Sequence, residues 1–229
     1  MKYFLYSLLI IVVLVIGFLV LRNKGNNQNL AALVGDAEKQ EKESARGVNL
    51  SDGEYFFQKG DRIMWSGRKP LKTDYSDLGT VAIRSGAFTV QEGRVSDGLI
   101  VLDMNSLRVD VTGSGRGQDG LANHLQSADF FAVSDFPTIK FQVLESFEIM
   151  IDGVVSVNGE LTVKDTVREL SLPLTIYQQG EETRIKSQFS WDRTQWEVKY
   201  GSGNFFDNLA DNVIDDQVVI SFDVAVIKK

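Results

Sequence analysis

The sequence predicts an all-β domain, a closed antiparallel barrel of about eight strands with one short helix, behind an N-terminal transmembrane helix. Three observations indicate this: period-two alternation of apolar and polar residues from about residue 54 onward, turn signals between the alternating segments, and a continuous apolar run at the start. The expected organisation is a membrane anchor at 1–22, a polar and charged tether at 23–50 and a β-barrel domain at 51–229.

The alternation is clearest over 155–163, where apolar or small residues occupy every odd position and polar residues every even one. Such a strand has one dry face and one wet face. The segments 139–143, 170–176 and 218–226 repeat the pattern, and weaker versions lie at 54–66, 79–90, 94–104 and 183–191. Turn pairs separate several of them: Glu92-Gly93, Asp152-Gly153 and Gln179-Gly180.

Between about 113 and 136 the alternation stops. A short helix is expected there, with Asp119 as its N-cap and with Leu121 and Leu125 on one face. One short helix cannot cover the dry face of an eight-stranded sheet, so closure of the sheet into a barrel is the economical arrangement.

The N-terminal run from Tyr3 to Leu21 is almost continuously apolar, and about 20 such residues span the hydrocarbon of a bilayer. A cleaved secretory signal is the competing interpretation, but no small-x-small site follows Leu21, and without cysteine a lipoprotein anchor is excluded. An uncleaved signal anchor is therefore expected. The dense charges at 36–46 carry no buried helix face and indicate a solvated tether.

Charge and composition exclude several functions. The first 24 residues hold Lys2, Arg22 and Lys24 and no acid, so the net charge of −7 becomes −10 for the remainder, which disfavours nucleic acid as a partner. The chain has no cysteine and one histidine. No nucleophile elbow or calcium loop is present, and the glycine pattern at 115–120 lacks a βαβ context, so we expect no enzyme activity, metal or cofactor.

The segment 121–141 (LANHLQSADFFAVSDFPTIKF) closely resembles the hallmark "HL.S.DFF…(Y/F)PT..F" stretch of YceI-like proteins. Further similar features occur in order along about 54–227: Trp65-Ser-Gly-Arg-Lys69, Gly86 opening a "G.(F/L).V..G" strand, Leu102-Asp-Met-Asn-Ser-Leu107, 157–163, Phe189-Ser-Trp-Asp-Arg193 and Val198-Lys-Tyr-Gly201. The chain departs from the pattern at Asp77, where many relatives have histidine, and in its retained anchor.

The resemblance implies a lipocalin-like barrel, exported to the bacterial periplasm or cell surface, that binds polyisoprenoid chains in its interior. We therefore expect a binding protein on the outer face of the cytoplasmic membrane, holding an isoprenoid or quinone-precursor lipid. A homodimer is a further expectation that the resemblance raises. The alternative is an interaction or envelope-stress module whose barrel is filled by side chains, because a barrel of about eight strands is either packed or just wide enough for one ligand.

Inward positions of the predicted strands give the candidate lumen residues. Gly159 is expected to leave room beside a wall formed by Phe141, Val143, Val157, Leu161, Val163, Leu172, Leu174, Phe189 and Trp191. Phe130 and Phe131 are gate or plug residues. His124 either contacts a headgroup or anchors the helix, and Arg193 either forms a structural ion pair with Asp192 or contacts a headgroup.

Overall fold

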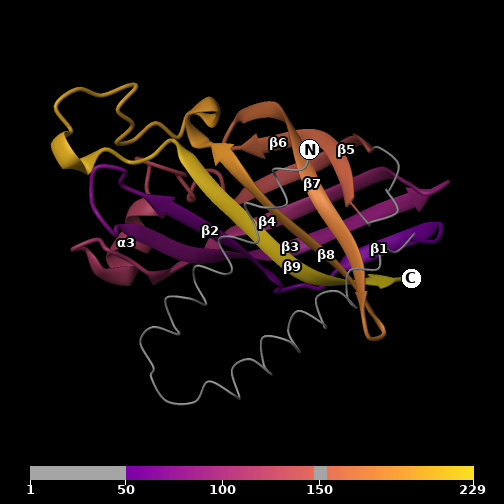
Figure 1. The fold of residues 1–229 in the computed structure, drawn as a ribbon. Coiled ribbons are helices and arrows are strands. Elements are labelled where there is room, and N and C mark those ends of the chain that lie inside the picture. The colour runs from indigo at the N-terminus through magenta and orange to yellow at the C-terminus, as the bar shows by residue number, and fades with distance from the viewer. Residues whose placement is uncertain (1–49, 147–153) are drawn as a thin grey trace, which may run out of the picture. The chain divides into compact units, whose positions relative to one another are not determined.

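The computed structural model describes residues 50–146 and 154–229, which form one closed antiparallel sheet (Figure 1). The elements in chain order are β1 (Gly53–Phe57), β2 (Arg62–Arg68), β3 (Ser76–Gln91), β4 (Arg94–Val111), α3 (Gly117–Gln126), β5 (Thr138–Ser146), β6 (Val154–Val163), β7 (Thr166–Gln179), β8 (Glu182–Asp192), the 3-10 helices η1 (Arg193–Trp196) and η2 (Ala210–Asn212), and β9 (Gln217–Lys228).

Closure of the sheet comes from pairing at both ends of the strand order. Consecutive strands from β4 to β9 pair as neighbours, β9 then pairs with both β1 and β2, and both of these pair with β3, which returns to β4. β1 and β2 thus share one position in the wall, so the described segments make an eight-stranded barrel, as the sequence predicts.

The strand expected over 54–66 is divided in two by a short turn. At this turn the Gly60 N–H donates to the Ile83 carbonyl (3.1 Å) and the Ile83 N–H donates to the Asp61 carbonyl (2.6 Å). Gly60 has φ +97°, a conformation that glycine adopts without steric strain. The interruption was not predicted because the apolar residues on either side still fit one alternating pattern.

The antiparallel order gives the barrel two distinct ends. The connections 69–75, 112–137 and 193–216 gather at one end, which we call the α3 end, and Figure 1 shows α3 and the yellow segment before β9 there. The turns at 92–93 and 180–181 lie at the other, which we call the hairpin end, together with the start of β1 and the C terminus.

The hairpin end is closed by packed side chains. Leu50, Tyr55, Phe88, Val90 and Val95 are all buried in one cluster, and the rings of Tyr55 and Phe88 stack with centroids 5.2 Å apart. The Tyr55 hydroxyl donates to the Ser51 carbonyl (2.9 Å), so its polar atom is satisfied. This end of the barrel is therefore an ordinary hydrophobic core.

The helix α3 begins three residues earlier than expected. Its N-cap is Arg116, which makes no side-chain capping bond, and Asp119 lies within the first turn, so the prediction of Asp119 as N-cap is wrong. Leu121 is buried and Leu125 packs against the core, as predicted. An acidic residue in the first turn is favourable through the helix dipole, which explains the similar sequence signal.

Several sequence expectations fall outside the described residues: the transmembrane helix at 1–22, most of the tether at 23–50 and the Asp152-Gly153 turn. Within 50–146 and 154–229, no helix is long and apolar enough to cross a bilayer. The turn at Glu92-Gly93 is present, with φ of +52° and +74° at its two residues, and Gly180 has φ +63° in the turn after β7.

Gly79 on β3 marks a close approach that requires glycine. A Cβ there would lie 2.1 Å from the Arg108 carbonyl oxygen and 2.5 Å from Cζ2 of Trp65. We expect Gly79→Ala to lower the free energy of unfolding by about 1–3 kcal/mol, because backbone and an indole ring must both shift. Gly67→Ala is the matched control on β2, since its Cβ would meet nothing within 4 Å. Urea unfolding followed by circular dichroism measures both, and equal stabilities would contradict the packing described.

Candidate ligand-binding cavity

The interior of the barrel contains a cavity of about 680 Å³. Its walls come from β1 to β9, and at the α3 end it reaches the connections 69–75, 112–137 and 193–216. A volume of this size lies within the roughly 300–1,000 Å³ typical of ligand sites. The side-chain-filled interior that the sequence left open is therefore not the arrangement found in the described residues.

The register of the sheet places the predicted wall residues together. Phe141 pairs with Leu161 across β5 and β6, and Val157 pairs with Leu172 across β6 and β7, so these side chains share the inner face. The predicted residues that line the cavity are Phe130, Phe131, Phe141, Val143, Val157, Leu161, Val163, Leu172, Leu174, Phe189, Trp191, His124 and Arg193. Their contact with a ligand remains a prediction.

Gly159 is placed differently from what was expected. It is buried on the inner side of β6 but does not line the cavity, because a Cβ there would lie 2.5 Å from Cζ of Phe141. The space left by the missing side chain is filled by the Phe141 ring. The inference that this small residue opens the lumen is therefore wrong, since the Phe141 ring occupies the volume that the missing side chain leaves.

Several inward apolar side chains are only partly buried. Val155, Val157 and Ile176 are almost fully enclosed, whereas Leu161 and Leu174 retain accessible surface although they lie on the same inner face. The other partly buried apolar residues around this core are Phe57, Ile63, Leu102, Leu170 and Phe189. Apolar surface that faces inward and stays uncovered is what an empty lumen produces, and it would be buried by an apolar guest.

At the α3 end, three rings narrow the opening. His124 on α3 meets the rings of Phe130 and Tyr200 at centroid distances of 5.1 and 4.9 Å, and its Nε2 lies 3.0 Å from Oδ2 of Asp129. Phe130 is only 4% exposed, yet it lines the cavity, so it both packs and borders the lumen. His124 thus anchors α3 to the rim and also faces the opening.

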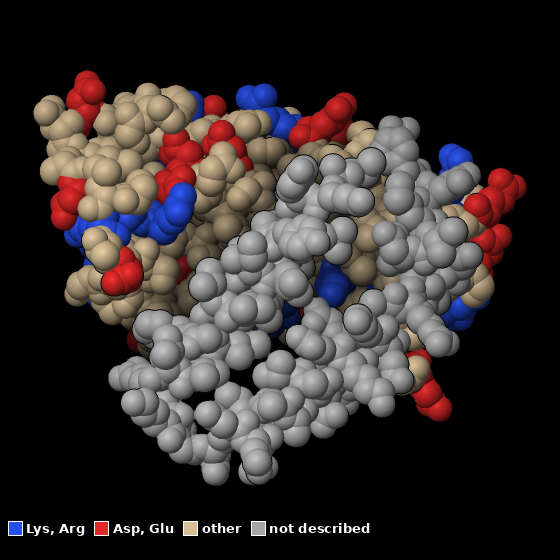
Figure 2. Space-filling view, viewed as in Figure 1, with Lys and Arg blue, Asp and Glu red and all other residues tan. Residues whose placement is uncertain are grey.

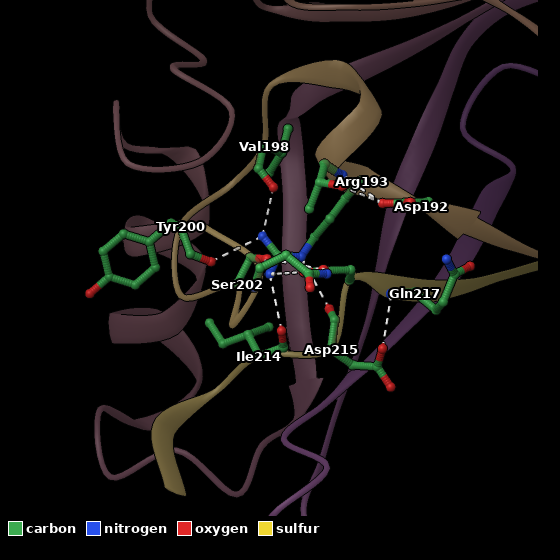
Figure 3. Close-up of polar contacts among 11 residues, drawn as sticks. Asp192, Arg193, Val198, Tyr200, Ser202, Ile214, Asp215 and Gln217 are labelled. Atoms are coloured by element: carbon green, nitrogen blue, oxygen red, sulfur yellow. Dashed lines mark hydrogen bonds and ion pairs between the residues drawn. The ribbon is translucent and has the colours of Figure 1, made fainter. Parts of the chain in front are cut away.

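Arg193 is a buried hub of the segment before β9 (Figure 3). Its side chain is 3% exposed, and its five N–H groups donate to the carbonyls of Val198, Tyr200, Ile214 and Asp215 and to the Asp216 carboxylate. A guanidinium has five donors, so none remains for a headgroup. This geometry favours the structural interpretation of Arg193.

The expected ion pair between Asp192 and Arg193 is not formed as predicted. The carboxylate partner of Arg193 is Asp216, at 3.3 Å, whereas Asp192 accepts hydrogen bonds from the backbone and hydroxyl of Thr194 at 3.0 and 2.7 Å. Burial raises the pKa of Asp192, but the hydrogen bonds from Thr194 and Gln195 and the charge of Arg193 together outweigh it and leave that pKa below its usual value. Asp192 therefore caps η1, a role that adjacency in sequence does not reveal.

Residues of the connecting segments at the α3 end were missed by the sequence analysis. Lys69, Tyr75, Arg116, Phe206 and Leu209 line the cavity there. They lie in connections without periodicity, so no sequence signal was available. The inner residues of β2 to β4 and β9, such as Trp65, Ile83, Met104 and Phe222, were also omitted, although alternation in their strands could have identified them.

Tyr75 gives this rim a distinct electrostatic feature. Burial, followed by the nearby charge of Asp77 and a hydrogen bond to it, raises the pKa of Tyr75 to about 12. Asp77 also accepts a hydrogen bond from the Thr112 hydroxyl at 2.5 Å. The phenol is therefore a neutral donor at physiological pH, and the carboxylate of Asp77 is held within the protein.

A closed antiparallel barrel with an apolar internal cavity and one covering helix defines the class of lipocalin-like binding folds. Residues 67–226 match the YceI-like domain, and the chain belongs to the YceI-like family.

Solved structures share this fold. BcnA of Burkholderia cenocepacia is similar, with a TM-score of 0.54 and 16% identity over 73% of this chain and 96% of that one. A polyisoprenoid binding domain from Saccharophagus degradans, implicated in plant cell wall breakdown, has a TM-score of 0.53 and 15% identity over 76% of this chain and 98% of that one. No curated protein matches the sequence.

Replacing Arg193 tests its role as the hub of the segment before β9. We expect Arg193→Met to lower the free energy of unfolding by about 3–5 kcal/mol, because four buried or partly buried carbonyls and a carboxylate lose their donor. Arg68→Met, which removes a 67% exposed side chain bonded to Asp215, should change stability by about 1 kcal/mol or less. Urea unfolding compares the two, and a similarly small loss in both variants would contradict the assignment.

Proposed function

We propose that the protein is a binding protein that holds a long apolar lipid of isoprenoid or quinone-precursor type in the barrel lumen. The observation that carries this proposal is the apolar cavity of about 680 Å³ bordered by partly exposed inward side chains. The similar domain from Saccharophagus degradans, a polyisoprenoid binding domain by its description, gives the isoprenoid class its support.

The energetics suit an apolar chain without polar anchors along its length. Each buried methylene contributes about 0.8 kcal/mol, so a dozen contribute about 10 kcal/mol. Association costs an estimated 4–15 kcal/mol, so this gain exceeds the cost over the lower part of that range. Two features reduce further cost. The barrel wall is a continuous hydrogen-bonded sheet that is already formed, and the uncovered leucines already face the lumen.

We further propose that residues 1–22 anchor the chain in the cytoplasmic membrane, with the barrel on the outer side. The described domain starts at the hairpin end, opposite the opening. β3 has 16 residues and is therefore roughly 50 Å long at about 3.3 Å per residue. A tether spanning 23–50 reaches up to about 90 Å when extended, so it is long enough to let the α3 end face the bilayer.

Filling the lumen should weaken binding. Leu161 and Glu160 are neighbours on β6 that face opposite sides, since Leu161 lines the cavity and Glu160 is exposed. We expect Leu161→Trp to weaken retention of a radiolabelled long-chain isoprenoid alcohol at least tenfold, about 1.4 kcal/mol, and Glu160→Trp to leave it unchanged. Gel filtration of the full chain in neutral detergent measures retention. Wild-type retention by Leu161→Trp, with wild-type folding, would show that the lumen is not the site.

The membrane placement can be tested with a single cysteine, because the chain has none of its own. Glu181 lies exposed in the turn after β7, so Glu181→Cys should react with a membrane-impermeant maleimide in intact spheroplasts. The protein should also stay in the membrane pellet after a carbonate wash. Adding Leu14→Arg and Val15→Arg should release it, since each charge costs about 2.5–3.5 kcal/mol at the centre of a span. Labelling only after lysis would place the barrel inside the cell.

A further inference from the structure

The charged side chains that line the cavity are unevenly balanced. Among the described lining residues, the basic ones outnumber the acidic one, and all lie toward the α3 end: Arg68, Lys69, Arg116 and Arg193 against Asp77. Figure 2 shows acidic and basic side chains interspersed at this end of the molecule, so the charge available to a ligand depends on which basic side chains already have an acidic partner.

Two of these cations are neutralised within the protein. Nε of Arg68 lies 2.6 Å from the Asp215 carboxylate. All five N–H groups of Arg193 donate to groups of the protein, with Asp216 as its carboxylate partner. Of the cations on neighbouring segments that do not line the cavity, Lys72 pairs with Asp211 at 3.4 Å and Lys199 with Glu197 at 2.6 Å. None of these is available to a ligand without breaking an existing pair.

Lys69 and Arg116 differ from the others. Nζ of Lys69 donates to the amide oxygen of Asn212 (3.1 Å) and lies 5.3 Å from the centroid of the Tyr75 ring, and both partners are neutral. Arg116, the exposed residue before α3, forms no ion pair within the part of the chain that the structure describes. The lining carboxylate, Asp77, is already bonded to Thr112.

The two cations act on each other. The pKa of Lys69 is lowered first by burial and then by repulsion from Lys72, and Arg116 adds to that repulsion, while Asp77 and Asp211 only partly oppose it. A negative charge bound between Lys69 and Arg116 would relieve this repulsion and favour the charged form of Lys69.

We infer that the mouth of the cavity selects an amphiphile with an anionic headgroup, a phosphate monoester or a carboxylate, held by Lys69 and Arg116 while its apolar chain occupies the lumen. This inference rests on the proposed function. Arginine can bind either anion through two parallel hydrogen bonds, and the lysine adds a point charge. Tyr75 and Ser114 also line the mouth, but the Tyr75 hydroxyl is already hydrogen-bonded to Asp77 and to Ser114.

The net negative charge of the chain does not oppose this assignment. Charges more than about 8–10 Å away are largely screened at physiological ionic strength, so the local groups decide the preference. Asp211 and Asp215 are each paired with a cation, Lys72 and Arg68. Asp77 keeps its charge, because its partner Thr112 is neutral, but it only partly offsets the effects that lower the pKa of Lys69.

The test compares headgroups on one hydrocarbon chain. The full chain in neutral detergent is titrated with an isoprenoid alcohol, the corresponding carboxylic acid and the corresponding monophosphate, all of the same chain length. Quenching of intrinsic tryptophan fluorescence reports binding, because Trp65 and Trp191 line the cavity. We expect at least one of the two anions to bind about tenfold more tightly than the alcohol, as one charge-assisted hydrogen bond contributes about 1.5–3 kcal/mol.

Variants separate this inference from the proposed function. The double variant Lys69→Gln with Arg116→Gln should lose the preference for the anion and keep the affinity for the alcohol, and Lys199→Gln, a cation outside the lining, should keep both. Preference for only the phosphate or only the acid identifies the headgroup. Equal binding of all three amphiphiles by the wild type, or an equal loss of all three in the double variant, would overturn the inference and leave lipid binding intact. Failure of the wild type to bind any of them would overturn both.

Discussion

Pairing of β3 with both β4 and the divided strand β1 and β2 is the constraint on which the rest of the structure depends. It removes both edges of the sheet, so every described strand has two neighbours and one face of each turns inward. A barrel with about eight strand positions leaves an interior that side chains can just fill. The lumen therefore exists where the inward side chains do not reach one another. A shift of one residue in the pairing of a strand would move its apolar side chains to the outer face.

The two ends of the barrel use that interior differently. At the hairpin end, Tyr55 and Phe88 stack and close the core, whereas near the α3 end Leu161 and Phe189 retain uncovered surface. The segment before β9 that borders the opening is irregular, and its carbonyls cannot be satisfied by a strand partner. Arg193 supplies those donors from one buried side chain, which explains why a charged residue lies so deep beside an apolar cavity.

The alternation in the sequence predicted which face of a strand points inward. It could not predict which side chains from distant segments fill a space or pair with a charge. Strict alternation at 155–163 predicted the inner face of β6 correctly, because successive side chains of a strand point to opposite faces of the sheet. Gly159 looked like free space, but the ring that fills it comes from Phe141 on the neighbouring strand. Likewise, Asp216 is 23 residues from Arg193, so no local pattern could pair them. Lys69 and Arg116 both line the opening because the pairing of β2 with β3 and of β3 with β4 brings their connections to the same end of the barrel.

These features together describe a preformed apolar container with a closed end and a charged opening. The most direct test of this account is native mass spectrometry of the full chain, isolated from membranes in neutral detergent without added lipid and followed by organic extraction. We expect an adduct whose extracted mass is that of an isoprenoid amphiphile. A bare protein that also takes up no added isoprenoid would contradict the account.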